Sequence, residues 1–272
     1  MASIPTQSGL PSGRFSPGAI LSAAWPAALV VGLILLAWEL YALFSGIRAT
    51  TLPSPSRVAT QIYLNAPALF DNALPTLAET VIGFALSISV AVVLSVIIDF
   101  FQPIRRALFP VFIISQTLPL VAIAPLVVLW FGFGLLPKIL LVALVTFFPM
   151  LVALVQGYDS TERDLEWLLR SMGAPKWKVF TLARVPSAIP FFFTGLRISI
   201  TYAVVGAIFA EYAGAEKGLG IYMLSAKNNF RSDLVLAAVA VSAILTLVLF
   251  GAAILIQRLA TPWEIQTKER KP

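Results

Sequence analysis

The chain has 272 residues, of which 59% are hydrophobic and 12% are charged, and its mean hydropathy is +0.91. Because soluble domains carry about 25% charged residues, a chain this apolar needs lipid as the solvent for part of its surface. The sequence contains no Cys and no His, which excludes a disulfide framework, a Cys/His metal site, a thiol nucleophile and a Ser-His-Asp triad and leaves only carboxylate chemistry open.

Six blocks of the chain are long and apolar enough to cross a bilayer as helices, which requires about 20 mostly apolar residues each. The predicted spans cover residues 26–44, 76–98, 107–131, 138–155, 186–210 and 234–256. Around them we expect a flexible cytoplasmic tail over 1–25, an extracytoplasmic loop over 45–72, a transmembrane core over 73–257 and a cytoplasmic tail over 258–272. The predicted fold class is therefore an all-α integral membrane protein.

The third predicted span contains Pro110, Pro119 and Pro125, so it is either one broken helix or two shorter helices. The charges of the loops decide between six and seven spans. With the N-terminus inside, most Arg and Lys residues fall in cytoplasmic segments, and the outer loops hold only Arg48, Arg57, Lys138, Lys217, Lys227 and Arg231. This bias favours six spans with both termini in the cytoplasm, and it explains the net charge of +6 without nucleic acid as a partner.

The predicted cytoplasmic loop over 156–185 contains an amphipathic helix. Its apolar stripe follows the i, i+3, i+4, i+7 spacing and consists of Leu165, Leu168, Leu169 and Met172. From periodicity alone, such a helix either rests on the membrane surface or docks on a soluble partner.

Both ends of this helix carry capping signals. We expect Asp159 to cap the start, with Glu162 at the spacing of a capping box. Gly173 is expected to end the helix in the left-handed conformation, and Pro175 prevents its continuation. After Ala174 and Pro175, Trp177 and Phe180 begin a second short amphipathic stretch.

The spacing of glycine and proline in this loop is distinctive. Gly173 is followed ten residues later by the run Ala183-Arg184-Val185-Pro186, and Pro190 comes after it. The loop thereby resembles that of binding-protein-dependent ABC importer permeases, whose pattern is E-A-A-x(3)-G-x(9)-I-x-L-P. The E-A-A positions hold Trp167, Leu168 and Leu169 instead, and the nearest acid, Glu166, lies one residue early.

The resemblance extends over about 52–258. It includes Leu52-Pro53-Ser54-Pro55, Thr194-Gly195-Leu196-Arg197, Ala210-Glu211 and Gly218-Leu219-Gly220. The loop is most similar to the nitrate, sulfonate, taurine and thiamine-precursor branch of the family. Glu211-Tyr212 with Tyr222-Met223-Leu224 favours its pyrimidine-precursor or riboflavin members.

The resemblance implies a type I importer fold and a set of partners. Two permeases, expected as a homodimer, would enclose a path for a small solute. A dimeric ATP-binding subunit would bind ATP with its magnesium ion, and an extracytoplasmic binding protein would deliver the solute. Each permease would place its coupling helix in a groove of the ATP-binding subunit. The residues implied in that coupling are Glu162, Glu166, Trp167, Leu168, Leu169, Met172, Gly173, Ala174, Pro175 and Trp177, with Pro186 and Pro190 as motif anchors.

No Walker phosphate loop of the form G-x-x-x-x-G-K-[ST] occurs in the chain. The chain therefore cannot bind ATP by that route, and the resemblance implies a transport subunit that is not an enzyme, binds no cofactor itself and sits in the inner membrane. An ion-coupled secondary transporter is the alternative class, and it would favour mid-membrane acids and an inverted repeat. An intramembrane enzyme would need clustered catalytic groups, which the sequence does not show.

Polar residues within the predicted spans are candidates for the path or for structural pairs. Arg197 could face the path or form an ion pair with Glu79, and Glu211 could be an outer gate or an interface charge. Gln116 and Thr117 could line the path or only join helices. Glu39 is expected to reach the interface or face a neighbouring helix. The sequence leaves open the solute and whether the two permeases are identical.

Overall fold

The computed structural model describes residues 17–261, with side chains described from Trp25 onward. All regular elements within that range are helical, which confirms the predicted fold class. The α-helices are α1 (Pro17–Phe44), α2 (Pro55–Leu64), α3 (Ala66–Phe100), α4 (Gln102–Thr117), α5 (Leu120–Phe131), α6 (Leu135–Asp159), α7 (Arg163–Ser171), α8 (Lys176–Val179), α9 (Val185–Gly214), α10 (Leu219–Asn228) and α11 (Ser232–Ala260); η1 (Phe180–Arg184) is π-helical.

Five helical segments of the described residues are long and apolar enough to cross a membrane, or six if the bent pair of α4 and α5 counts as one span. This pair falls in the third predicted span, and the chain bends by 102° between the two helices. The break falls at Leu118, which is extended (ψ 126°) because the ring of Pro119 disfavours a helical conformation before it. Pro110 and Pro125, in contrast, lie inside α4 and α5.

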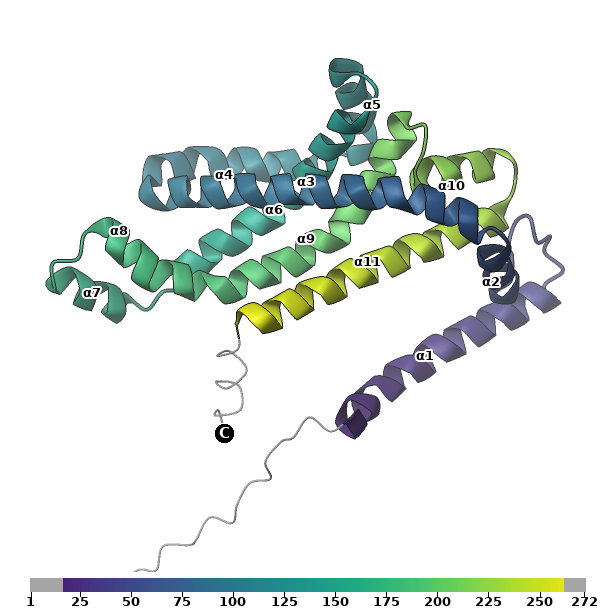
Figure 1. The fold of residues 1–272 in the computed structure, drawn as a ribbon, viewed down its shortest axis with the longest axis horizontal. Helices are drawn as coiled ribbons and strands as arrows, with labels where there is room; N and C mark the ends of the chain where they lie inside the picture. Colours follow the sequence, from purple (N-terminus) through teal and green to yellow (C-terminus); the bar gives the residue numbers. More distant parts are fainter. Residues whose placement is uncertain (1–16, 262–272) are drawn as a thin grey trace, which may run out of the picture.

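Helices α3, α6 and α9 form the core of the bundle, and α11 lies along α9 (Figure 1). Small residues allow the three core helices to approach closely, as is typical of membrane bundles. A Cβ at Gly83 of α3 would lie 2.6 Å from Cβ of Val142, and one at Gly195 of α9 would lie 2.6 Å from Cβ of Ala153. The bundle has two distinct ends: α7 and α8 lie at one, and α2 and α10 at the other (Figure 1).

The first helix is hydrogen-bonded to the start of α2 through one acidic side chain. Glu39 of α1 accepts hydrogen bonds from the backbone N–H (2.9 Å) and hydroxyl (2.7 Å) of Ser56, at the start of α2. It therefore stabilises the N-terminus of a neighbouring short helix. The segment 45–72, expected as a loop, contains α2 and the first turns of α3, and α1 begins at Pro17 within the expected tail. The remaining tail residues, 1–16 and 262–272, lie outside the described part of the chain.

Candidate functional site

The start of α7 differs from the prediction. Asp159 is the last residue of α6 and accepts two hydrogen bonds from Arg105, at 3.0 and 2.6 Å. The N-cap of α7 is Glu162, whose side chain makes no capping hydrogen bond. The predicted capping box is therefore wrong, because the Asp159 carboxylate is held by the guanidinium group of α4 instead.

The end of α7 agrees with the prediction. Gly173 has φ +80°, its N–H donates to the carbonyl of Arg170 (2.9 Å), and the N–H of Ala174 donates to the carbonyl of Leu169 (3.0 Å). This pair of bonds is a Schellman motif, which satisfies two of the carbonyls left free at a helix end. A Cβ at Gly173 would meet no atom within 4 Å. The backbone conformation, rather than crowding, therefore requires glycine here.

The apolar stripe of α7 is divided between two directions. Leu169 is half-buried against the bundle, whereas Leu168 and Met172 are 57% and 76% exposed, and Trp167 on the adjacent face is 75% exposed. None of the residues of α7 is buried. Contiguous exposed apolar side chains of this kind mark a contact with a protein or a membrane.

The inward side of α7 is polar. Glu166, expected among the coupling contacts, turns toward the bundle and accepts from Arg184 at 2.7 and 3.2 Å. Arg184 also donates to Asp99 at the end of α3. Neither Arg184 nor Asp99 was predicted from the sequence to be a coupling or path residue. The sequence carried one signal for this pairing. Asp99 follows the second predicted span and Arg184 precedes the fifth, so the acid and the base are expected on the same side of the membrane.

An aromatic cluster supports the segment after Gly173. The ring of Trp177 lies 5.9 Å from that of Phe100 and 5.7 Å from that of Phe180, and Phe180 lies 5.2 Å from Tyr158. Offset aromatic pairs at such distances stabilise packing. Of the motif prolines, Pro186 lies in the first turn of α9, directly after the π-helical η1, and Pro190 lies further inside the helix.

A buried ion pair lies at the opposite end of the bundle. Nζ of Lys138 in the first turns of α6 is 2.6 Å from Oε1 of Glu79 in α3, and the two residues are 8% and 2% exposed. Lys138 is therefore a helix residue rather than a loop residue, and Glu79, the candidate ion-pair partner of Arg197, pairs with Lys138 instead. Arg197 is half-buried, and its Nε donates to the carbonyl of Phe193 in its own helix (3.3 Å).

The reason for the wrong pairing is depth along the helices. Thr76, one turn before Glu79, contacts Glu211 of α9. Glu211 lies about 21 Å beyond Arg197 along α9, at about 1.5 Å per residue. Arg197 is therefore too far from the end of the bundle that holds Glu79.

Glu211 is a buried cap for α10. It is fully buried and accepts from the Thr76 hydroxyl (2.6 Å) and from the N–H of Gly220. Thr76 in turn accepts from the N–H of Leu219 (2.9 Å). Carboxylates are stabilised at helix N-termini by free N–H groups and the helix dipole. The complete burial of Glu211 argues against an interface charge in the described structure, and the role of an outer gate stays a prediction.

Gly218 is required by this cap. It has φ +139°, and a Cβ there would overlap the carboxylate of Glu211. We expect Gly218→Ala to lower the melting temperature of the detergent-solubilised protein, because it combines backbone strain of about 1–3 kcal/mol with displacement of Glu211. Gly251→Ala in α11 is the matched control, since a Cβ there meets nothing within 4 Å. Equal melting temperatures for the two variants would contradict this account of the cap.

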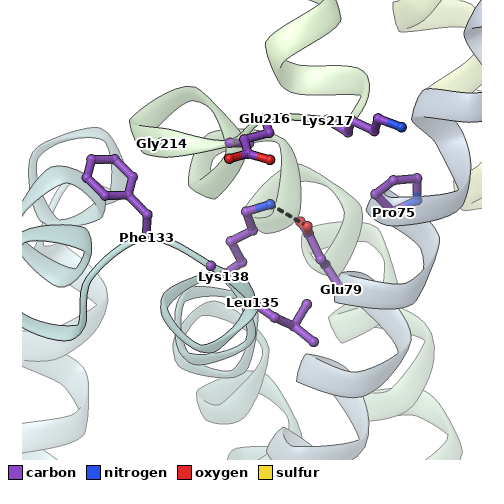
Figure 2. Close-up of a pocket in the computed structure, with 10 residues that line it drawn as sticks. Pro75, Glu79, Phe133, Leu135, Lys138, Gly214, Glu216 and Lys217 are labelled. Carbon is purple, nitrogen blue, oxygen red and sulfur yellow. Dashed lines mark hydrogen bonds and ion pairs between the residues drawn. The ribbon is translucent and has the colours of Figure 1, made fainter.

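A cavity of about 570 Å³ opens beside the buried ion pair. Figure 2 shows Lys138 and Glu79 at its centre, Phe133 to one side, and Glu216 with Lys217 at the turn between α9 and α10. A volume of this size suits a small organic molecule. Gln116, Thr117 and Arg197 do not line this cavity; Gln116 and Thr117 are exposed at the end of α4.

Five or six helical segments of membrane-crossing length, with a short peripheral helix that exposes apolar side chains, define an integral membrane protein of the helical-bundle class. The sequence pattern of the family described as "Binding-protein-dependent transport system inner membrane component" matches residues 83–263. The chain belongs to this family, and it is the permease of an ABC importer rather than an ATPase, in the inner membrane.

Relatives and a solved structure agree with this assignment. The chain is 36% identical to the formylaminopyrimidine transport permease protein ThiX of Halalkalibacterium halodurans, over 85% of this chain and 92% of that protein. It is 35% identical to the riboflavin transport system permease protein RibX of Chloroflexus aurantiacus, over 95% and 99%. An amino acid ABC transporter crystallised with histidines has the same fold, with a TM-score of 0.61 at 14% identity over 73% of this chain and 97% of that one.

Proposed function

We propose that the chain docks through α7 on a separate, dimeric ATP-binding subunit, pairs with a second copy of itself and receives its solute from an extracytoplasmic binding protein. The exposed apolar face of α7, with Leu168 and Met172 turned away from the bundle, carries this proposal. ATP and magnesium would be bound by the partner subunit, since this chain has no Walker phosphate loop.

Reconstitution in proteoliposomes tests the transport function. Uptake of solute is expected only when the permease, the ATP-binding subunit, ATP with magnesium and the binding protein are all present. Uptake driven by an ion gradient without ATP would instead support a secondary transporter. Omitting each component in turn is the control for its contribution.

For the solute, we propose an uncharged, ring-shaped vitamin precursor such as an aminopyrimidine or a flavin, rather than a sulfonate. The relatives named for formylaminopyrimidine and riboflavin are more than a third identical to this chain. The charged residues that line the cavity are two acids and two bases, with Lys138 paired to Glu79 and with Glu216 next to Lys217, so the lining has no net positive charge to attract an anion. Uptake of a labelled solute into the same vesicles can be measured with unlabelled aminopyrimidine, riboflavin or taurine added in turn. The degree to which each compound inhibits uptake would rank the three as solutes.

The proposed orientation places both termini and α7 on the cytoplasmic side, because basic residues concentrate there. Single cysteines in this cysteine-free chain report it directly. We expect Tyr63→Cys, exposed on α2, to react with a membrane-impermeant maleimide in intact spheroplasts. Ser171→Cys on α7 is expected to react only after permeabilisation. The reverse pattern would overturn the orientation.

A further inference from the structure

Arg184 bonds to two other helices at the end of the bundle that carries α7. Its Nε and Nη2 donate to the two carboxylate oxygens of Glu166, at 2.7 and 3.2 Å. Its Nη1 donates to Oδ1 of Asp99, the penultimate residue of α3. Arg184 directly precedes α9, which begins at Val185. One guanidinium group therefore joins α7, α3 and α9.

Little else fixes α7 against the bundle. None of its side chains is buried, and hydrophobic stabilisation scales with the apolar area removed from water. Among the described residues, the hydrogen bonds that join α7 side chains to another helix are those between Glu166 and Arg184. The position of α7 relative to α3 therefore depends on this polar connection.

The surroundings of Arg184 strengthen the connection. The side chains of Asp99, Glu166 and Arg184 are 10%, 14% and 24% exposed, so solvent and salt screen the charges only partly. A planar guanidinium group can hold two carboxylates at once, which the single ammonium group of lysine does less well. Arg184 also ends the π-helical turn η1, in which the N–H of Val185 donates to the carbonyl of Phe180. Single π-helical turns are rare in proteins, and those that occur are often found at functional sites.

We propose that Arg184 is the positioning residue that makes α7 move as one rigid unit with the adjoining ends of α3 and α9. This inference rests on the proposed docking of α7 on the ATP-binding subunit. A displacement of α7 then shifts two core helices, instead of bending the loop that carries α7. Without the connection to Asp99, α7 stays docked but its movement no longer reaches α3, so ATP is hydrolysed without solute transport.

Spin labels in the full permease–ATPase complex can measure whether this unit is rigid. Ser171→Cys on α7 and Phe101→Cys at the end of α3 are both exposed and supply the label sites. The labelled copy is mixed with an excess of unlabelled permease, so that the measured distance is the one within a single copy. With Arg184 intact, we expect one narrow distance distribution that is the same with and without ATP. Asp99→Asn, which removes the charge on α3 while keeping its shape, is expected to broaden the distribution.

Coupling is read from the number of solute molecules transported per ATP hydrolysed. We expect Asp99→Asn to lower this ratio at least about fivefold, the lower end of typical coupling factors, while copurification with the ATP-binding subunit persists. Glu166→Gln should lower the ratio similarly, and Arg184→Lys should restore only part of it. Asp159→Asn is the control for loss of a neighbouring charge, because Asp159 bonds to Arg105 of α4 and has no hydrogen bond to a side chain of α7. That variant should retain the parent ratio.

Three outcomes distinguish this inference from the proposed function. If the parent permease fails to bind any ATP-binding subunit, the proposed docking and this inference both fall. If binding persists and Asp99→Asn keeps the parent ratio, this inference alone is wrong. A label distance that changes with ATP in the parent complex would also overturn it, since α7 and α3 would then move separately.

Discussion

Replacing Leu168 or Met172 by Asp is expected to abolish copurification of the chain with a tagged ATP-binding subunit. Both side chains lie on the outward face of α7, and their exposure in the isolated chain shows that they do not stabilise the bundle. In a docked complex, an unpaired carboxylate there would be placed in an apolar contact, which is strongly unfavourable. Hot-spot residues of an interface contribute about 2 kcal/mol or more, so we expect affinity to fall at least about thirtyfold.

Two further variants grade this result. Gly173→Val is expected to weaken docking less, because a φ of +80° costs a non-glycine residue about 1–2 kcal/mol but leaves the apolar face intact. Tyr63→Asp is the matched control, since it also puts a charge at an exposed aromatic position but lies on α2 at the other end. Full association of the Leu168→Asp and Met172→Asp variants with the ATP-binding subunit would instead support a helix that only rests on the membrane.

Patterns local to the chain predicted much of this architecture. Long apolar blocks predicted the helices, because each must satisfy its backbone hydrogen bonds within lipid. Gly173 and Pro175 predicted the end of α7, since only backbone chemistry is involved there. The three prolines of the third span predicted a break without its position, and the structure places the break at Leu118 and Pro119 while Pro110 and Pro125 lie inside helices.

Contacts between distant segments could not be predicted in the same way. Four apolar residues at helical spacing predicted one stripe, but the docking direction of α7 turns Leu169 inward and leaves Leu168 outside. The pairing of Asp159 with Arg105, rather than with the start of α7, likewise depends on where α4 lies. Periodicity identifies the faces of a helix and does not state which face meets a neighbour.

The partner of Glu79 was within reach of the sequence, but a different kind of reasoning was needed. Glu79 lies near the start of the second predicted span and Lys138 at the start of the fourth, so both lie at the same membrane side. Arg197 lies deep in the fifth span. Comparing depths along the spans, rather than searching for any opposite charge, would have selected Lys138.

Breaking the Glu79–Lys138 pair is expected to cause the largest loss of stability in the bundle. Lys138→Met leaves the Glu79 carboxylate buried beside apolar atoms, and removing one partner of a buried ion pair costs about 3–5 kcal/mol. Glu79→Gln leaves the ammonium group of Lys138 without its counter-charge. Both variants should therefore lower the unfolding temperature of the protein in detergent.

The double variant Glu79→Gln/Lys138→Met separates pairing from simple loss of side chains. Because it removes both charges together, it is expected to be more stable than the sum of the two single losses predicts, with a coupling energy within the range of about 0.5–3 kcal/mol seen for interacting residues. Arg197→Ala is the control, because Arg197 also lies within a membrane span but has no ion-pair partner among the described residues. It should lower the unfolding temperature less than Lys138→Met does. Strictly additive losses in the double variant would show that the two charges do not stabilise one another, whatever the distance between them.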